Sequence, residues 1–269
     1  MLDALNWPGF ADLCLAGLLF FCGAALLAGA VDAIVGGDGL NQLPVILLLL
    51  PGGEVIYSLA TNKVAAIAGT AAAARTYAKR TPIDWPAALS MAIVVLLGSL
   101  GGAILAGALR SQSLSVVVLV ALGLVGVPTW RKPELGSADS PRFQRRAQLL
   151  VMLAGGAVIR FYDGVAGPGT GSFLTFLLVG LVGFAFVTAS ATAKVVNVAT
   201  NIGALEFFVP AGKALWGSAL VMAVSNIPGS VVGAMIAAKR GSGFVRRVFL
   251  TVVAGLVVSL GWKLAQASS

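Results

Sequence analysis

The sequence has no histidine and is poor in charged residues and cysteine. Without histidine among its 269 residues, a histidine proton relay and a histidine-ligated metal site are excluded. The two cysteines, Cys14 and Cys22, lie eight residues apart in one apolar segment, a spacing that does not suit a disulfide within a helix. No glycine-rich loop ending in Lys-Ser or Lys-Thr is present, so the sequence has no ATPase motif. We therefore expect no metal ion and no cofactor.

Long apolar runs dominate the chain instead. Hydrophobic residues make up 58% of it and charged residues only 10%, and the mean hydropathy is +0.97. Apolar segments fall at roughly 11–34, 40–50, 54–78, 84–108, 113–130, 147–162, 171–182, 187–209, 214–238 and 244–264. Many reach the length of about 18 or more residues that a membrane-spanning helix needs. The sequence predicts an all-α integral membrane protein, with the lipid bilayer as its partner.

The net charge of +8 is better explained by membrane topology than by nucleic-acid binding. The basic residues lie in short loops between apolar runs and form no extended basic face. We therefore expect no nucleic acid as a partner.

The two halves of the chain match at an offset of 131 residues. The matches include residue types that an apolar composition alone would not align: Asp32 with Asp163, Lys63 with Lys194, and Trp85 with Trp216. The most polar stretch lies between the halves. We predict a first transmembrane repeat at 1–130, a cytoplasmic linker at 131–146 and a second transmembrane repeat at 147–269.

The distribution of basic residues predicts that the second repeat is inverted. If the short segments count as crossings, each half has five segments, and eleven basic residues lie on the side of the linker against three on the other. The eleven are Lys79, Arg80, Arg131, Lys132, Arg142, Arg145, Arg146, Lys239, Arg240, Arg246 and Arg247, and the three are Arg110, Lys213 and Lys263. The linker is then cytoplasmic and both termini lie outside.

Each half contains one glycine-rich break followed by an apolar segment too short to cross the bilayer straight. The breaks are 32–40 and 164–173, and the short segments are 40–50 and 171–182. Inverted repeats with interrupted helices are typical of secondary transporters, whose sites lie near the membrane midplane. The N-termini of the short helices are candidate anion sites, formed by Gly37, Gly39, Asn41, Gly169, Thr170, Gly171 and Ser172. The alternative is that Asp163, Thr170 and Ser172 only cap helices.

Two lysines fall deep inside predicted spans. Lys63 is the tenth residue of segment 54–78, and Lys194 is the eighth of segment 187–209. A charge at such a depth costs at least ~2.5 kcal/mol, so both side chains should face the protein interior. They either neutralise an anionic substrate or form ion pairs with Asp32 and Asp163. Arg160, just before the second break, is a candidate anion gate or a residue that extends to the membrane surface.

A polar stripe follows one face of the segment 187–209. Ser190, Lys194, Asn197 and Asn201 recur at spacings of four, three and four residues, which places them on one side of a helix. Such a stripe either joins helices by hydrogen bonds or lines a substrate pathway. Because it includes a lysine, we favour the pathway, with Asn197 and Asn201 as substrate contacts.

These motifs resemble those of the TauE/SafE family of sulfite and organosulfonate exporters. The resemblance rests on Phe161-Tyr162-Asp163-Gly164 with the run 167–173, on Ala193-Lys194 with the stretch Asn197 to Asn201, and on the first-half residues Asp32-Ala33, Gly36-Gly37 and Ala60-Thr61-Asn62-Lys63. It covers nearly the whole chain and implies a multi-pass transporter of the bacterial inner membrane. Asp38 and Arg160 depart from the family pattern, in which glycine and a small residue are usual.

The sequence thus predicts a secondary transporter, not an enzyme. The substrates that the resemblance implies are small sulfur-containing anions such as sulfite, thiosulfate, sulfoacetate or related organosulfonates, exported by alternating access. The alternatives are ion-coupled uptake of a sulfur anion or small carboxylate, with the aspartates binding the cation, and a non-transporting membrane assembly protein. The sequence leaves open whether the chain forms a homodimer.

Overall fold

The computed structural model describes residues 15–36, 42, 46, 55–106, 136–166 and 170–268, and each element in this part of the chain is a helix. The order is α1 (Leu15–Val35), α3 (Val55–Ala78), α4 (Trp85–Ala106), α6 (Arg145–Ala166), α7 (Thr170–Phe176), the π-helix η1 (Leu177–Val182), α8 (Phe186–Phe208) and α9 (Trp216–Ser268). The all-α prediction is confirmed for these residues. The predicted segments 40–50 and 113–130 lie outside them.

The helices have the dimensions and the surface of a membrane protein. α1, α3, α4, α6 and α8 contain 21 to 24 residues, or about 32–36 Å at about 1.5 Å per residue. Large hydrophobic residues recur every four positions along the outer face of α4. Leu89, Ile93 and Leu97 are 53–67% exposed. By length and composition, two described stretches qualify as membrane spans, Trp85–Gly102 and Trp216–Gly255. Apolar side chains on the outside are what a hydrocarbon solvent favours.

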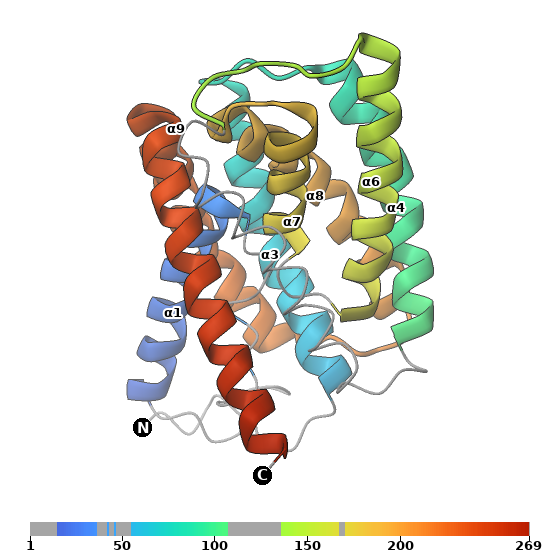
Figure 1. Cartoon of the computed structure of the whole chain (residues 1–269). Coiled ribbons are helices and arrows are strands. Elements are labelled where there is room, and N and C mark those ends of the chain that lie inside the picture. The colour runs from blue at the N-terminus through green and yellow to red at the C-terminus, as the bar shows by residue number, and fades with distance from the viewer. Residues whose placement is uncertain are drawn as a thin grey trace.

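Helix α9 consists of two arms that meet at Gly241. Its backbone there has φ 75 and ψ −177, which is not helical. The arms, 216–240 and 242–268, correspond to the two predicted segments 214–238 and 244–264. In Figure 1 the turn between the arms lies at the same end of the bundle as the start of α6, and the C-terminal end of α9 lies at the opposite end, where α1 begins.

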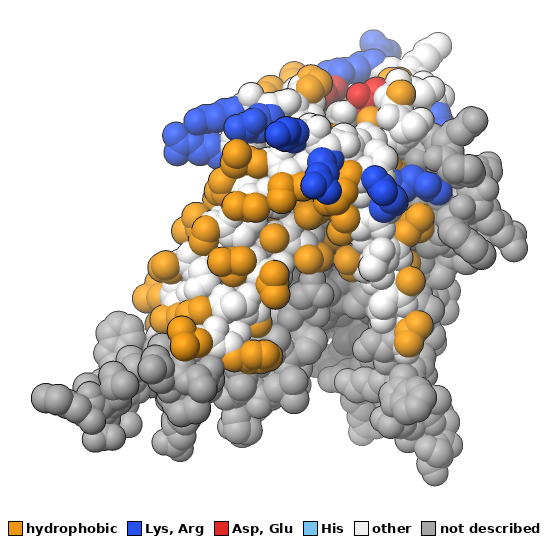
Figure 2. All heavy atoms as spheres, turned by 90° about the vertical axis from the view of Figure 1, so that its left-hand side faces the viewer, with side chains coloured by type: hydrophobic (Ala, Val, Ile, Leu, Met, Phe, Trp, Pro, Cys, Tyr) orange, Lys and Arg blue, Asp and Glu red, His pale blue; other side chains and the backbone are white. Residues whose placement is uncertain are grey.

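Basic side chains gather at one end of the molecule. On the face that Figure 2 shows, lysine and arginine side chains cluster at the upper end, and hydrophobic side chains cover the surface below them. The upper end is the one at which α6 starts and α9 turns. This is the pattern expected of a membrane protein whose basic loops share one side of the bilayer.

Helices from one half of the chain pack on helices of the other. α1 and α3 pack against α9, while α6 and α8 pack against α4, and α3 and α8 contact each other. Glycines allow the closest approaches. A Cβ atom at Gly229 would lie 2.0 Å from the carbonyl oxygen of Leu26, and one at Gly98 would lie 3.3 Å from that of Ala157. Both the glycines and their partners are 131 residues apart.

Helices extend into the second predicted glycine-rich break, 164–173, from both sides. α6 continues through Gly164 to Ala166, and α7 starts at Thr170. Without water to satisfy free backbone groups, a helix in a membrane gains by continuing its hydrogen bonds even through glycine. The predicted short segment 171–182 corresponds to α7 and η1 together. η1 ends at Val182 and is capped by Gly183, whose φ of 94 is left-handed and whose N–H donates to the carbonyl of Leu178.

The described part of the predicted linker is attached to the start of α8. The backbone N–H of Ser140 donates to the carbonyl of Gly183 at 2.7 Å, and the N–H of Ala185 donates to Oδ1 of Asp139 at 2.7 Å. Asp139 therefore satisfies a backbone donor at the beginning of α8.

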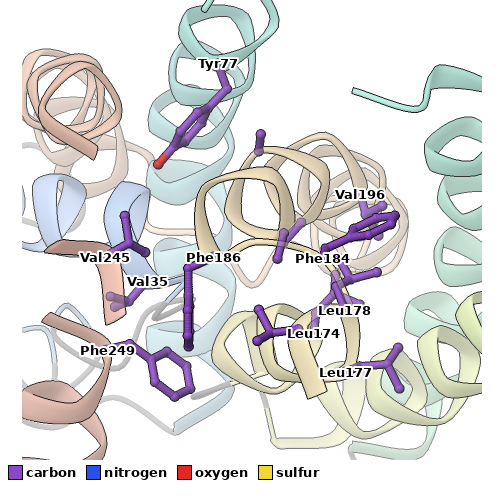
Figure 3. Close-up of a cluster of buried hydrophobic side chains, with 14 of the residues drawn as sticks. Val35, Tyr77, Leu174, Leu177, Leu178, Phe184, Phe186, Val196, Val245 and Phe249 are labelled. Carbon is purple, nitrogen blue, oxygen red and sulfur yellow. The ribbon is translucent and has the colours of Figure 1, made fainter. Parts of the chain in front are cut away.

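The largest apolar cluster of the described residues surrounds α7, η1 and the end of α1. Figure 3 shows Val35 of α1, Leu174 of α7 and Phe186 of α8 among its members. Phe186 packs against Phe249 of α9 with ring centroids 5.5 Å apart. This packing fixes the ends of α1 and α7 deep in the bundle, where the polar residues of the predicted site lie.

Candidate functional site

Among the residues that the structure describes, five charged side chains lie inside the helical bundle. They are Asp32 of α1, Lys63 of α3, Arg160 and Asp163 of α6, and Lys194 of α8. The side chains of Arg160, Asp163 and Lys194 are 0% exposed, Lys63 is 5% exposed and Asp32 is 14% exposed. A buried charge without a partner would strongly destabilise the protein. We therefore expect these side chains to form ion pairs with one another.

The two deep lysines form ion pairs that join the halves of the chain. Nζ of Lys63 lies 2.8 Å from Oδ2 of Asp163, and Nζ of Lys194 lies 2.7 Å from Oδ2 of Asp32. Each lysine thus binds an aspartate from the other half. The aspartates are 131 residues apart, and so are the lysines. Of the two roles that the sequence left open for these lysines, ion pairing is the one seen in this structure.

The ion pair between Lys63 and Asp163 is part of a larger polar group. Nη1 of Arg160 lies 3.7 Å from Oδ2 of Asp163, and it donates a hydrogen bond to Oγ1 of Thr170 at 3.2 Å. The Thr170 hydroxyl in turn donates to Oδ1 of Asp163 at 2.5 Å. Nη2 of Arg160 donates to Oδ1 of Asn197 on α8. Lys63, Arg160 and Thr170 therefore all face one carboxylate.

The interior of the bundle carries an excess of positive charge. Three cationic side chains face two carboxylates among the buried charges of the described residues. Attraction between opposite charges and repulsion between like charges are both much stronger in this poorly screened interior than in water. Such a cluster favours a small anion and opposes a cation.

The end of α1 lies in the interior, where hydroxyl groups satisfy its last carbonyls. The carbonyls at a helix C-terminus have no intrahelical donor. Each of three accepts a hydrogen bond from a side chain: Ala33 from Tyr77 at 2.9 Å, Ile34 from Ser190 at 3.0 Å and Val35 from Ser172 at 3.3 Å. Figure 3 shows the Tyr77 oxygen directed toward α1. The Ser172 hydroxyl thus holds α7 against the end of α1.

The remaining predicted site residues fall into three groups. Gly171 lies against Gly36, since a Cβ atom on Gly36 would lie 2.7 Å from the Gly171 carbonyl. Asn201 is 2% exposed on α8, and its Nδ2 has no hydrogen-bond partner among the described residues. Four predicted residues lie outside the described part of the chain: Gly37, Gly39, Asn41 and Gly169.

Sequence reasoning missed Tyr77 and the contacts of Arg160. The residue that matches Tyr77 in the second half is Phe208, which has no hydroxyl, so the repeat gave no signal for it. Ser190 could be found from the polar stripe on α8. Among the described residues, no group of three or more histidine, cysteine, aspartate or glutamate side chains has a geometry that could hold a metal ion.

Comparisons with known proteins identify the family of the chain. Residues 21–260 match the model of the family described as "Sulfite exporter TauE/SafE". No solved structure matches the chain significantly.

Curated relatives cover almost the whole chain. The "Probable membrane transporter protein ORF9" of Sinorhizobium sp is 32% identical over 249 residues, which are 93% of this chain and 94% of the relative. The "Probable membrane transporter protein YfcA" of Escherichia coli K12 is 32% identical over 91% of this chain and 89% of its own. A "Probable membrane transporter protein" of Haemophilus influenzae is also 32% identical, over 91% and 95%. The chain therefore belongs to the TauE/SafE family, and it is a membrane transporter and not an enzyme.

Proposed function

We propose that this transporter exports small sulfur-containing anions, such as sulfite, thiosulfate, sulfoacetate or related organosulfonates, across the inner membrane. The observation that carries the proposal is the excess positive charge buried between the two halves of the chain. The family description, which names sulfite export, supports the substrate class. An inside-negative membrane potential favours anion export by about 2.3 kcal/mol per charge per 100 mV, so export needs little additional coupling energy.

The anion is held between the lysines and the polar face of α8. Lys63 and Lys194 supply charge, and Asn197 and Asn201 supply amide groups on the same helix face as Lys194. The buried amide of Asn201, which has no partner among the described residues, is available to a ligand. The short-helix N-termini, with Thr170 at the start of α7, complete the proposed site.

Rocking of the two halves against each other would open the site to one side of the membrane and then to the other, which is alternating access. Each ion pair joins a residue of one half to a residue of the other, so relative motion of the halves changes both pairs. An inverted repeat, with 1–130 and 147–269 as its units and 131–146 as a cytoplasmic linker, fits this arrangement. The crosswise pairing and the crosswise packing of α1 on α9 and of α6 on α4 support it.

A flux measurement tests the function. Full-length protein in proteoliposomes should carry labelled sulfite, thiosulfate or sulfoacetate down an imposed potential. Lys194→Ala should lower the flux by about 10- to 100-fold, because a hydrogen bond to a charged group contributes about 1.5–3 kcal/mol. Lys239→Ala removes an exposed lysine and serves as the matched control, with unchanged flux expected.

The other outcomes of this experiment decide between the alternatives. Unchanged flux in Lys194→Ala would remove Lys194 from the site. Uptake that depends on a sodium or proton gradient would favour ion-coupled import, and no flux of any anion would favour an assembly role.

Cysteine labelling tests the inverted repeat. In a background without Cys14 and Cys22, a single cysteine is introduced at Ala138 or at Lys213, both of which lie in loops. A membrane-impermeant reagent should reach position 138 only from the cytoplasmic side and position 213 only from the other. Labelling of both positions from the same side would show that the topology is wrong.

A further inference from the structure

The environment of Asp163 is that of a bound anion. Both of its carboxylate oxygens are engaged, Oδ2 by Nζ of Lys63 at 2.8 Å and Oδ1 by the hydroxyl of Thr170 at 2.5 Å. The guanidinium of Arg160 lies 3.7 Å from Oδ2. An ammonium, a guanidinium and a hydroxyl are a donor set that recognises oxyanions.

We propose that the Asp163 carboxylate occupies the position of the transported anion. This inference rests on the proposed function. A sulfite, thiosulfate or sulfonate group presents negatively charged oxygens to the same donors, and it binds by displacing the carboxylate from Lys63 and Arg160. The Asp163 side chain thus competes with the transported anion for the same donors.

The position of Asp163 on α6 suits such a displacement. α6 ends at Ala166, so Asp163 lies in its last turn. The carboxylate can leave its partners by a local change of this turn, while the rest of the helix stays packed on α4. Asn197 of α8 holds Nη2 of Arg160 and so keeps the guanidinium in place when the carboxylate moves away.

Competition from Asp163 also gives a transporter the weak binding that it needs. Two cations with no carboxylate between them would hold an anion tightly in this poorly screened interior and slow its release. While Asp163 can return to Lys63 and Arg160, it helps to expel the anion. Lys194 supplies charge to the bound anion from α8, while its pair with Asp32 joins the two halves.

The first half has neither an arginine nor an asparagine at the positions that match Arg160 and Asn197. These positions hold Gly29 and Ala66. A Cβ atom at Gly29 would lie 2.6 Å from the carbonyl oxygen of Asn226, so packing against α9 leaves no space for a side chain there.

The test is the affinity of thiosulfate and sulfite for purified full-length protein, measured by calorimetry or by thermal stabilisation in detergent. Asp163→Asn keeps the shape of the side chain and removes its charge. It should lower the Kd of both anions by at least about tenfold, because the competing charge is gone. Asp32→Asn should change the Kd less. Glu206→Gln removes an exposed carboxylate and should leave the Kd unchanged.

A second variant covers the case in which Asp163→Asn does not fold. Arg160→Lys keeps the positive charge but loses the planar fork that reaches both Thr170 and Asn197. It should raise the Kd of thiosulfate. An unchanged or raised Kd in folded Asp163→Asn, or an unchanged Kd in Arg160→Lys, would overturn the inference. Flux by the unmodified protein is measured separately, and its absence would overturn the proposed function instead.

Discussion

The two ion pairs in the interior occupy matching positions in the two halves but have different surroundings. The distance from the lysine Nζ to the aspartate Oδ2 is nearly the same in both pairs, 2.7 Å for Lys194 with Asp32 and 2.8 Å for Lys63 with Asp163. Asp32 is 14% exposed, whereas Asp163 is 0% exposed and also faces Arg160. The comparison teaches that one repeat position holds a lysine–aspartate pair in both halves, and that in the second half an arginine on the same helix as the aspartate adds a further positive charge.

Charge swaps should separate the two pairs most strongly. Exchanging the partners in Asp32→Lys with Lys194→Asp preserves one cation and one anion. The equivalent exchange, Asp163→Lys with Lys63→Asp, places a second cation beside Arg160, three residues away on α6. We expect the second double variant to be less stable than the first by about 3–5 kcal/mol.

The free energies of unfolding of the single and double variants form two double-mutant cycles. They can be measured by denaturant unfolding in detergent micelles, with folded yield as a second readout. Equal recovery of stability in both swaps would show that Arg160 is not coupled to Asp163, and the contrast between the two pairs would fail.

Two matched glycines, Gly98 and Gly229, offer a smaller test of how equivalent positions differ between the halves. A Cβ atom at Gly229 would lie 2.0 Å from the Leu26 carbonyl, whereas one at Gly98 would lie 3.3 Å from the Ala157 carbonyl. Gly229→Ala should destabilise the protein by about 2 kcal/mol, because α1 and α9 must move apart. Gly98→Ala should cost under about 1 kcal/mol, because the neighbouring backbone needs to shift only slightly.

Unfolding midpoints of both glycine variants against the unmodified protein check this order. A larger loss in Gly98→Ala would show that α4 and α6 pack more tightly than α1 and α9.

The sequence predicts the helices well because apolar runs and bilayer thickness together limit their lengths. The segments 54–78 and 187–209 differ from α3 and α8 by only a residue or so at each end. It also predicts that Lys63 and Lys194 are buried, since charge cannot face hydrocarbon. Which aspartate binds which lysine could not be predicted, because that depends on how the two halves pack together.

The sequence also could not predict how far α6 extends or what Arg160 contacts. Glycine at 164 suggests a break from local propensity, but the helix continues to Ala166 because its backbone groups have no water to bind. Arg160 meets Asn197 across 37 residues of sequence. Nothing in the local pattern of either residue indicates this contact.

The last difference between the halves is a single hydroxyl group at the end of α1. Tyr77 is 0% exposed and donates to the Ala33 carbonyl at 2.9 Å, whereas its match in the second half is Phe208. Tyr77→Phe makes the two positions alike and should cost about 1 kcal/mol of unfolding free energy, because a buried carbonyl loses its donor. Tyr57→Phe is the control, since its hydroxyl lies 3.4 Å from Nζ of Lys213 and should contribute less. Equal losses in the two variants would show that the Tyr77 hydroxyl does not stabilise the end of α1.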